Sequence, residues 1–354
     1  MKNSRTKQEQ YYGEYLGLDK ILDAQHPESE ARNVEAHDEM LFIIIHQTYE
    51  LWFKQIMHEL DSILAIFDTE EINDNSAAIQ TALHRLGRII EIWKVLVDQV
   101  RVLETMTPMD FLDFRDLLTP ASGFQSYQFR ILEAKLGLKM DARHQNKYYQ
   151  SQLKDKHIEG ITKVENQHSL FELVDQWLGR MPFWDVDKYW STFEVPQGAD
   201  QNLHPFWATY KHLYQEGLSK GESSNIDMSR FDRTFFGGEG RNLDLSAASC
   251  RATLFITLYR DYPLLQQPFQ LLNKLLEIDE LMANWRYRHM IMVRRMIGMR
   301  SGTGGSSGAA YLKGAMNKHH IFGDLAGLST YLMPRKKLPK LPKKLVERLL
   351  FKDI

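Results

Sequence analysis

Three long stretches of the chain carry the hydrophobic pattern of helices. Residues 38–66, 78–106 and 269–297 contain no proline, and Gly87 is their only glycine. Apolar residues recur there every three or four positions, which is the period of one helix face. Between turn signals, no stretch alternates apolar and polar residues as a strand does. The pattern therefore predicts an all-α protein.

The same pattern divides the chain into segments. Residues 1–37 form a polar entry with a short helical piece, whereas residues 38–138 and 246–333 hold the dense helical pattern. Residues 139–245 are the most polar and are predicted to be an insertion or a small helical subdomain. Residues 334–354 form a basic tail, for which two interpretations stay open: a solvated end or a site for an acidic partner.

Two of the apolar helix faces contain a histidine, and Asp38 is the predicted N-cap of the first. That face comprises Phe42, His46, Tyr49, Phe53, Ile56, Leu60 and Ile63. The second comprises Leu275, Ile278, Met282, Trp285, His289, Met292 and Met296. Residues at these spacings share one side of a helix. Both His46 and His289 are therefore expected on a buried or half-buried face.

Two buried histidines in a helical chain allow three interpretations. Each can be an ordinary core residue, or an axial haem ligand, which needs a neutral imidazole held among apolar walls. The chain has no Cys-x-x-Cys-His motif, so a haem would not be covalently attached. A zinc site needs three or four close ligands. His46 and Glu50 form an i, i+4 pair, but no third ligand is evident.

A glycine-rich stretch follows the second histidine helix at residues 301–308, SGTGGSSG. It lacks the Gly-Lys-Ser/Thr ending of a phosphate-binding loop, and it follows a helix rather than the strand of a dinucleotide fingerprint. Successive backbone N–H groups of such a stretch can bind a small anion. The same composition also suits a flexible linker, so both interpretations stay open.

Arg115 lies among aromatic residues just before the turn TPASG. A guanidinium in that position can hold a carboxylate with two parallel hydrogen bonds. It can equally pair with Asp110, Asp113 or Asp116. The segment alone does not decide between these alternatives.

Composition narrows the classes of partner and compartment. Lys and Arg total 44 and Asp and Glu total 46, giving a net charge of −2, which excludes a global basic field for nucleic acid. Cys250 is the single cysteine, which excludes an internal disulfide and a cysteine-rich metal site. No apolar run approaches the roughly 18 residues of a membrane span, and the N-terminus lacks the apolar core of a signal peptide. We therefore expect a cytoplasmic protein with no nucleic-acid or membrane partner.

Several motifs resemble the tryptophan 2,3-dioxygenase family. They are FIIIHQTYELWFKQIMHELDS, DFRDLLTPASGFQS, WRYRHMIMVRRMIG and GTGGSSG, supported by YGEYLGLDKILDAQ and LSTYLMPR. The similarity is spread over about residues 10–138 and 246–335, in the order of the family. Residues 139–245 do not carry it clearly. Ala309 and Ala310 occupy places where some family members carry an aromatic residue.

The resemblance implies a fold, an assembly and a reaction. The fold is a haem-binding helical bundle of the tryptophan/indoleamine dioxygenase type, whose N-terminal segment is contributed to the neighbouring subunit. The assembly is a homotetramer, a dimer of dimers, with one haem b per subunit that is ferrous when active. The reaction inserts both atoms of O2 across the indole C2–C3 bond of L-tryptophan. It yields N-formyl-L-kynurenine and is the first step of the kynurenine pathway.

The resemblance also implies a role for each matching residue. His289 is the axial ligand of the haem iron, His46 is the distal histidine that contacts the indole N–H, and Arg115 binds the substrate carboxylate. The other substrate-binding residues are Phe42, Ile43, Ile44, Ile45, Phe111 and Thr303, with Tyr12, Tyr15 and Leu16 from a neighbouring subunit. The residues that line the haem or substrate are Ser122, Gly123, Trp285 and Tyr311. Three rivals remain: a haem enzyme with another substrate, a haem sensor or carrier, and a helical scaffold.

Overall fold

The computed structural model describes residues 10–69, 76–138, 151–184, 186–225, 227–298, 300 and 320–350. Within these ranges every regular element is a helix and no strand occurs, so the all-α prediction is confirmed. Over the same ranges, no helix combines the length and the apolar character that crossing a bilayer requires.

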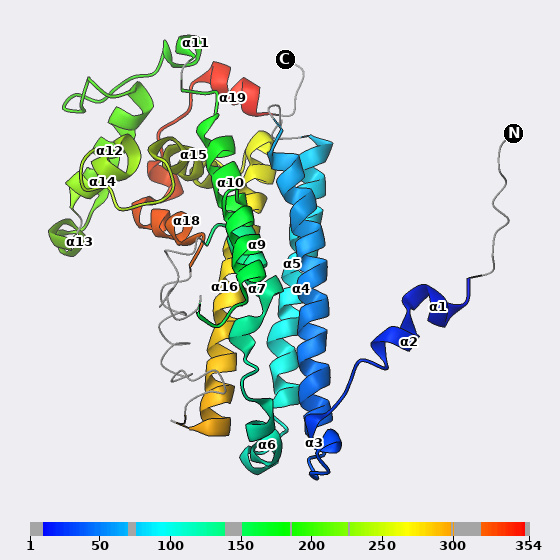
Figure 1. The fold of residues 1–354 in the computed structure, drawn as a ribbon. Coiled ribbons are helices and arrows are strands. Elements are labelled where there is room, and N and C mark those ends of the chain that lie inside the picture. Colours follow the sequence, from blue (N-terminus) through cyan, green and yellow to red (C-terminus); the bar gives the residue numbers. More distant parts are fainter. Residues whose placement is uncertain are drawn as a thin grey trace, which may run out of the picture.

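Three long helices form the axis of the molecule and lie side by side (Figure 1). They are α4 (Glu39–Phe67), α5 (Ala77–Leu103) and α16 (Pro263–Ile297). Both predicted apolar faces turn inward, because most of their aliphatic and aromatic members are buried in one continuous core. Burying such a face is the main source of helix stability in a folded protein.

Two details of the long helices differ from the sequence rules. Asp38 directly precedes α4, but its side chain makes no capping hydrogen bond. Instead the buried carboxylate of Glu39 accepts hydrogen bonds from the backbone N–H groups of Glu28 and Ser29, at 3.0 and 2.9 Å. The late helix begins at Pro263, ahead of the predicted start, and includes Pro268 in its second turn. Pro263 is at the first helical position, where no N–H is needed, whereas Pro268 removes one backbone hydrogen bond, the one that the carbonyl of Leu264 would accept.

Short helices connect α5 to the rest of the bundle. They are α6 (Pro108–Arg115), η1 (Asp116–Leu118), η2 (Gly123–Gln125) and α7 (Tyr127–Leu136). Thr107 and Asp110 form a reciprocal capping box at the start of α6, and Ser122 and Gln125 form one at η2. Ser126 then caps α7. Such caps satisfy the backbone N–H groups that a helix start leaves unpaired.

The middle and C-terminal parts add a second group of helices around a strongly aromatic core. Their bounds are α9 (Asp155–Glu165), α10 (Leu170–Gly179), α11 (Asp187–Trp190), α12 (Pro205–Gly217), α13 (Lys220–Asn225), α14 (Met228–Phe236), α15 (Ala247–Leu258), α18 (Gly323–Gly327), η3 (Leu328–Tyr331), η4 (Arg335–Lys337) and α19 (Lys343–Leu349). Buried rings such as Trp207, Phe231 and Phe255 belong to the same core as the long helices.

The N-terminal residues lie apart from the bundle. Helices α1 (Tyr12–Leu16) and α2 (Leu18–Ile21) project away from it, and α3 (Glu28–Ala31) lies near the start of α4 (Figure 1). Helix α1 buries no residue, and Tyr12 and Tyr15 are 72% and 70% exposed. Large apolar side chains exposed on a short helix mark a surface that gains stability from a partner.

Candidate functional site

His46 lies in the second turn of α4, with its imidazole fixed by its own helix. Its Nδ1 donates a hydrogen bond of 2.7 Å to the carbonyl oxygen of Phe42, since a carbonyl can only accept. The Phe42 ring lies 4.1 Å from the imidazole centroid. Burial lowers the pKa of His46 below its ordinary value, although the Phe42 carbonyl and the charge of Glu50 oppose this. The neutral ring therefore keeps Nε2 as a hydrogen-bond acceptor.

His289 lies in the third-last turn of α16, where its ring stacks on a neighbouring aromatic side chain. Its ring stacks on Trp285, with centroids 5.7 Å apart and planes 13° apart. Burial, and to a lesser degree the nearby His46, lower the pKa of His289 to about 4. Its nitrogens form no hydrogen bond with any described residue. At neutral pH it offers the uncharged nitrogen lone pair that a metal ligand requires.

Trp285 connects His289 to a cage of aromatic rings. Its centroid lies 5.8 Å from Tyr49, 6.1 Å from Phe53, 6.0 Å from Trp93 and 5.2 Å from Phe129. These rings come from α4, α5 and α7, so three helices fix the orientation of the Trp285 side chain. Close packing of this kind holds a stacked imidazole in one rotamer.

The two histidines interact electrostatically across the site. A charge on His46 contributes to the lowered pKa of His289, which requires the two imidazoles to be near neighbours in the fold. They come from different helices, α4 and α16, and from positions 243 residues apart along the chain. The structure thus brings together the two histidines that the sequence pattern singled out.

Helix α6 adds an aromatic layer and the arginine. The Phe42 ring lies 5.9 Å from Phe111 and 5.6 Å from Phe114. Arg115 follows directly, with only 17% of its side chain exposed, and its Nη1 lies 3.6 Å from a carboxylate oxygen of Asp116. Because Asp116 is 92% exposed, this pair is weak. The guanidinium is therefore a mostly buried cation beside the aromatic layer.

The capping box of α6 accounts for one of the aspartates that could pair with Arg115. Asp110 accepts a hydrogen bond of 2.8 Å from the backbone N–H of Thr107. The Thr107 hydroxyl and backbone N–H together hold the pKa of Asp110 below its ordinary value. This carboxylate therefore serves the start of α6. Asp113 is exposed to solvent.

Glu50, the second ligand that a zinc site at His46 would need, is bound to other residues. Glu50 accepts hydrogen bonds from the side chains of Ser126 and Gln128, at 2.6 and 2.8 Å. Its carboxylate is thus engaged with α7 and the residue before it. Across the ranges that the structure describes, no three His, Cys, Asp or Glu side chains gather as a metal-binding group. The donor set fits a single imidazole ligand, as in a haem site, better than a zinc tetrahedron.

Comparison with known proteins now decides the family. A family model described as tryptophan 2,3-dioxygenase matches residues 1–332. The chain belongs to the tryptophan 2,3-dioxygenase family. It is thereby an oxidoreductase of the dioxygenase class, from a family whose members carry haem.

Proteins from distantly related organisms that are similar to this chain are named tryptophan 2,3-dioxygenase. A tryptophan 2,3-dioxygenase of Bdellovibrio bacteriovorus is 42% identical over 96% of this chain and 98% of its own length. Those of Dictyostelium discoideum and Mus musculus are 44% and 42% identical, covering 96% and 93% of this chain. They are themselves covered over 88% and 84% of their lengths. The similarity therefore includes residues 139–245, where the sequence motifs alone were weak.

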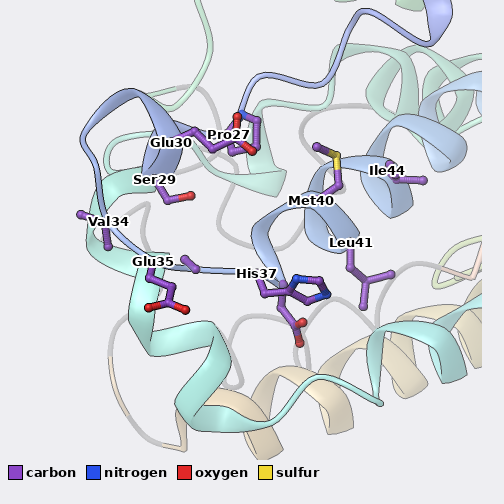
Figure 2. Close-up of a pocket in the computed structure, with 11 residues that line it drawn as sticks. Pro27, Ser29, Glu30, Val34, Glu35, His37, Met40, Leu41 and Ile44 are labelled. Atoms are coloured by element: carbon purple, nitrogen blue, oxygen red, sulfur yellow. The ribbon is translucent and has the colours of Figure 1, made fainter.

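The substrate segment expected of this dioxygenase family, residues 42–46, divides between two sides of α4. Phe42 and His46 face the aromatic layer of α6, whereas Ile45 is buried in the core and Ile43 is half-buried. Ile44 is 45% exposed and lines a different cavity of about 640 Å³ at the start of α4. Figure 2 shows Ile44 there with Leu41 and Met40, opposite the chain that leads into α4. Ile44 is thus on another side of the helix from His46.

Of the remaining family positions, two lie within the described residues and two lie outside them. Ser122 caps η2 and Gly123 begins it, close in the chain to α6 and α7. Thr303 and Tyr311 lie outside the described residues, as does the glycine-rich stretch 301–308.

The N-terminal positions expected to serve a neighbouring subunit do not line this chain's own site. Tyr12 and Tyr15 are exposed on α1, and Leu16 is 39% exposed. The structure contains one chain, so the predicted exchange of this segment remains a prediction.

Sequence reasoning missed one buried ionic cluster near the site. Glu133 is fully buried and accepts from Arg130 at 2.8 Å and from Arg286 at 3.0 Å. Both guanidiniums lie over the ring of Phe129, at 5.4 and 5.9 Å. The sequence offered one indication of this cluster: Arg286 lies three residues before His289 and is therefore near it on the same helix. The cluster joins α7 to α16 beside the histidine.

Proposed function

We propose that this protein inserts both atoms of O2 across the indole C2–C3 bond of L-tryptophan to give N-formyl-L-kynurenine. This is the first step of tryptophan degradation by the kynurenine pathway. The observation that carries the proposal is the pair of neutral imidazoles from α4 and α16, one held by a hydrogen bond and one without any to the described residues. Membership of the tryptophan 2,3-dioxygenase family supplies the reaction and the substrate.

The residues present fit a haem b bound through His289, one per subunit. The imidazole is neutral at physiological pH, its ring is fixed against Trp285, and the surrounding side chains are aromatic. These are the properties that an axial ligand requires. A ferrous haem supplies the redox-active iron that reacts with O2. The residues Ser122, Gly123, Trp285 and Tyr311 are assigned to the lining of the haem or substrate.

His46 orients the substrate in this proposal. Its Nδ1–H is bound to the Phe42 carbonyl, so Nε2 accepts a hydrogen bond from the indole N–H. The aromatic layer of Phe42 and Phe111, together with Ile43 and Ile45, forms the apolar side of the substrate pocket, whereas the family position Ile44 faces the cavity at the start of α4. A dry, apolar pocket strengthens each polar contact within it. His46 acts as a positioned acceptor rather than as an obligate general base.

The amino-acid end of tryptophan is assigned to Arg115 and Thr303. The mostly buried guanidinium of Arg115 binds the carboxylate through two charge-assisted hydrogen bonds. Thr303 binds near the ammonium and the carboxylate. A buried cation beside aromatic rings favours a ligand that has both a carboxylate and an apolar side chain. A ligand with only one of these two groups binds less well.

The active assembly in this proposal is a cytoplasmic homotetramer, a dimer of dimers. Tyr12, Tyr15 and Leu16 of one subunit enter the substrate pocket of its neighbour. The exposed rings of α1 support this, because the described residues leave them uncovered and a neighbouring subunit would bury them. Deleting residues 1–18 should raise the tryptophan KM or stop turnover, and full activity in a well-behaved monomer would contradict the exchange.

The proposed reaction is tested with purified, haem-loaded protein reduced to the ferrous state, L-tryptophan and isotopically labelled O2. We expect N-formyl-L-kynurenine that carries two labelled oxygen atoms. Haem-loaded protein that gives no product would favour a sensor or carrier. A colourless protein that takes up no haem would favour a scaffold, and product from another indole alone would favour a different substrate.

A further inference from the structure

Glu50 lies one helical turn after His46, on the same side of α4. It is half-buried, and the proposed chemistry gives it no role. Residues four apart on a helix are neighbours, so whatever Glu50 binds is held close to His46.

Within the part of the chain that the structure describes, the hydrogen bonds of the Glu50 side chain all reach a single place in the fold. The hydroxyl of Ser126 donates to one carboxylate oxygen at 2.6 Å, and Nε2 of Gln128 donates to the other at 2.8 Å. The same Nε2 lies 3.0 Å from the backbone carbonyl oxygen of Glu50. Both partners are 76 to 78 residues away in the chain, at the junction between η2 and α7.

That junction determines the position of the turn that contains Ser122 and Gly123. The backbone N–H of Ser126 donates to the carbonyl oxygen of Gly123 at 3.2 Å. Ser126 also caps α7, by accepting from the backbone N–H of Phe129 at 3.4 Å. A single residue thus ends η2, begins α7 and binds Glu50.

We propose that Glu50 is a positioning residue for tryptophan binding, which holds the Ser122–Gly123 turn against the His46 helix. This inference rests on the proposed function, in which that turn lines the site. Hydrogen bonds to an ionised carboxylate are shorter and stronger than neutral ones. Glu50 therefore fixes the turn more firmly than the caps of η2 and α7 do alone. A pocket wall that is held less firmly lowers the affinity for the ligand that packs against it.

The central test compares Glu50→Ala with Glu50→Gln in the haem-loaded protein. Alanine removes both side-chain acceptors, so KM for tryptophan should rise about tenfold, the value of one lost charged hydrogen bond. The Kd from titrating the haem absorption with tryptophan should rise equally, while kcat changes less than about threefold. Glutamine can keep both contacts without any rotation of Gln128, because its Oε1 accepts from Gln128 and its Nε2 donates to the Ser126 hydroxyl. Its KM should stay within about threefold of the wild-type value.

A matched control exists on the same helix. Glu59 is also a carboxylate of α4, buried, and it accepts hydrogen bonds from Gln55 and Arg88 at 2.7 and 2.8 Å. It lies about 20 Å along the helix from His46, at 1.5 Å per residue. Glu59→Ala should lower the unfolding temperature but leave the tryptophan KM and Kd unchanged.

Each outcome decides between positioning and general stability. An equal rise of KM in Glu59→Ala and Glu50→Ala would overturn the proposal, as would an unchanged Kd in Glu50→Ala or a Glu50→Gln variant as impaired as the alanine. If Glu50→Ala does not fold, Gln128→Ala removes one partner and should raise Kd by a smaller factor. Absence of wild-type turnover would instead contradict the proposed function, which keeps the two failures distinct.

Discussion

His46 and His289 are both imidazoles on apolar helix faces, but their surroundings differ. His46 binds the Phe42 carbonyl of its own helix and has the carboxylate of Glu50 one turn away. His289 has no hydrogen bond with the described residues and stacks on Trp285 inside an aromatic cage. Burial lowers both pKa values, and that of His289 falls to about 4.

In the proposed function, this difference separates an orienting group from a metal ligand. A bound Nδ1–H fixes the tautomer and leaves one nitrogen, Nε2, aimed by the helix. A ring that packing alone holds keeps its lone pair for a metal, and its orientation comes from the neighbouring rings. The cluster of Arg130, Glu133 and Arg286 strengthens the second arrangement, because it joins α7 to α16 three residues before His289.

The largest expected effect is on haem binding. His289→Ala should abolish stable haem binding while the helix still folds, because no other histidine lies on α16. The measurement is the haem absorption band after reconstitution, with far-ultraviolet circular dichroism as the control for folding. A band of normal height and unchanged ligation would show that the iron ligand is another residue.

The next effect concerns the substrate carboxylate. Lysine cannot copy the two parallel bonds of a guanidinium. Arg115→Lys should therefore lower kcat/KM for tryptophan by a factor that corresponds to a loss of about 2–4 kcal/mol in transition-state binding. The haem spectrum should be almost unchanged. Tryptamine lacks the carboxylate, so it should be a poor substrate whose use changes little in the variant. Equal losses for tryptophan and tryptamine would make Arg115 a structural residue.

A smaller effect is expected at the orienting histidine. His46→Ala should retain haem and reduce turnover without abolishing it, since one orienting hydrogen bond contributes on the order of 1–3 kcal/mol. Steady-state kinetics and the haem content of the same preparation measure both quantities. Loss of haem in this variant would mean that the roles of the two histidines are reversed.

The smallest effect is on the pH profile. The pKa of His46 lies below its ordinary 6.5 because of burial, so its neutral form persists as the pH falls through 6.5. The kcat/KM for tryptophan should therefore decline toward acid with a midpoint below pH 6.5, the midpoint expected of an ordinary histidine. His46→Ala should lack this decline. A midpoint at or above pH 6.5 would contradict the lowered pKa.

Parts of this arrangement could be predicted from the sequence because they follow from local periodicity. The long apolar faces place His46 and His289 on helices, and the spacing of Trp285 places it one turn before His289. Pro268 shows the limit of such rules, since α16 includes it near its start. The start of α4 shows another, because Glu39 rather than Asp38 carries the hydrogen bonds there.

Other parts depend on tertiary packing and could not be predicted. The bonds from Ser126 and Gln128 to Glu50, and from Arg286 to Glu133, join residues 76 to 153 positions apart. No local pattern specifies which distant polar groups meet in a core. The sequence likewise left the partner of Arg115 open, and the cap of α6 accounts for only one of the three nearby aspartates, Asp110.

The most direct test of the two roles is chemical rescue of haem binding. His289→Ala and His46→Ala proteins are reconstituted with haem with and without added imidazole, and the absorption band is compared. The account predicts that His289→Ala shows the band only when imidazole is supplied, because the free ligand replaces the missing nitrogen, and that His46→Ala shows it without help. A full band in His289→Ala without imidazole, or a band that depends on imidazole in His46→Ala, would contradict the assignment.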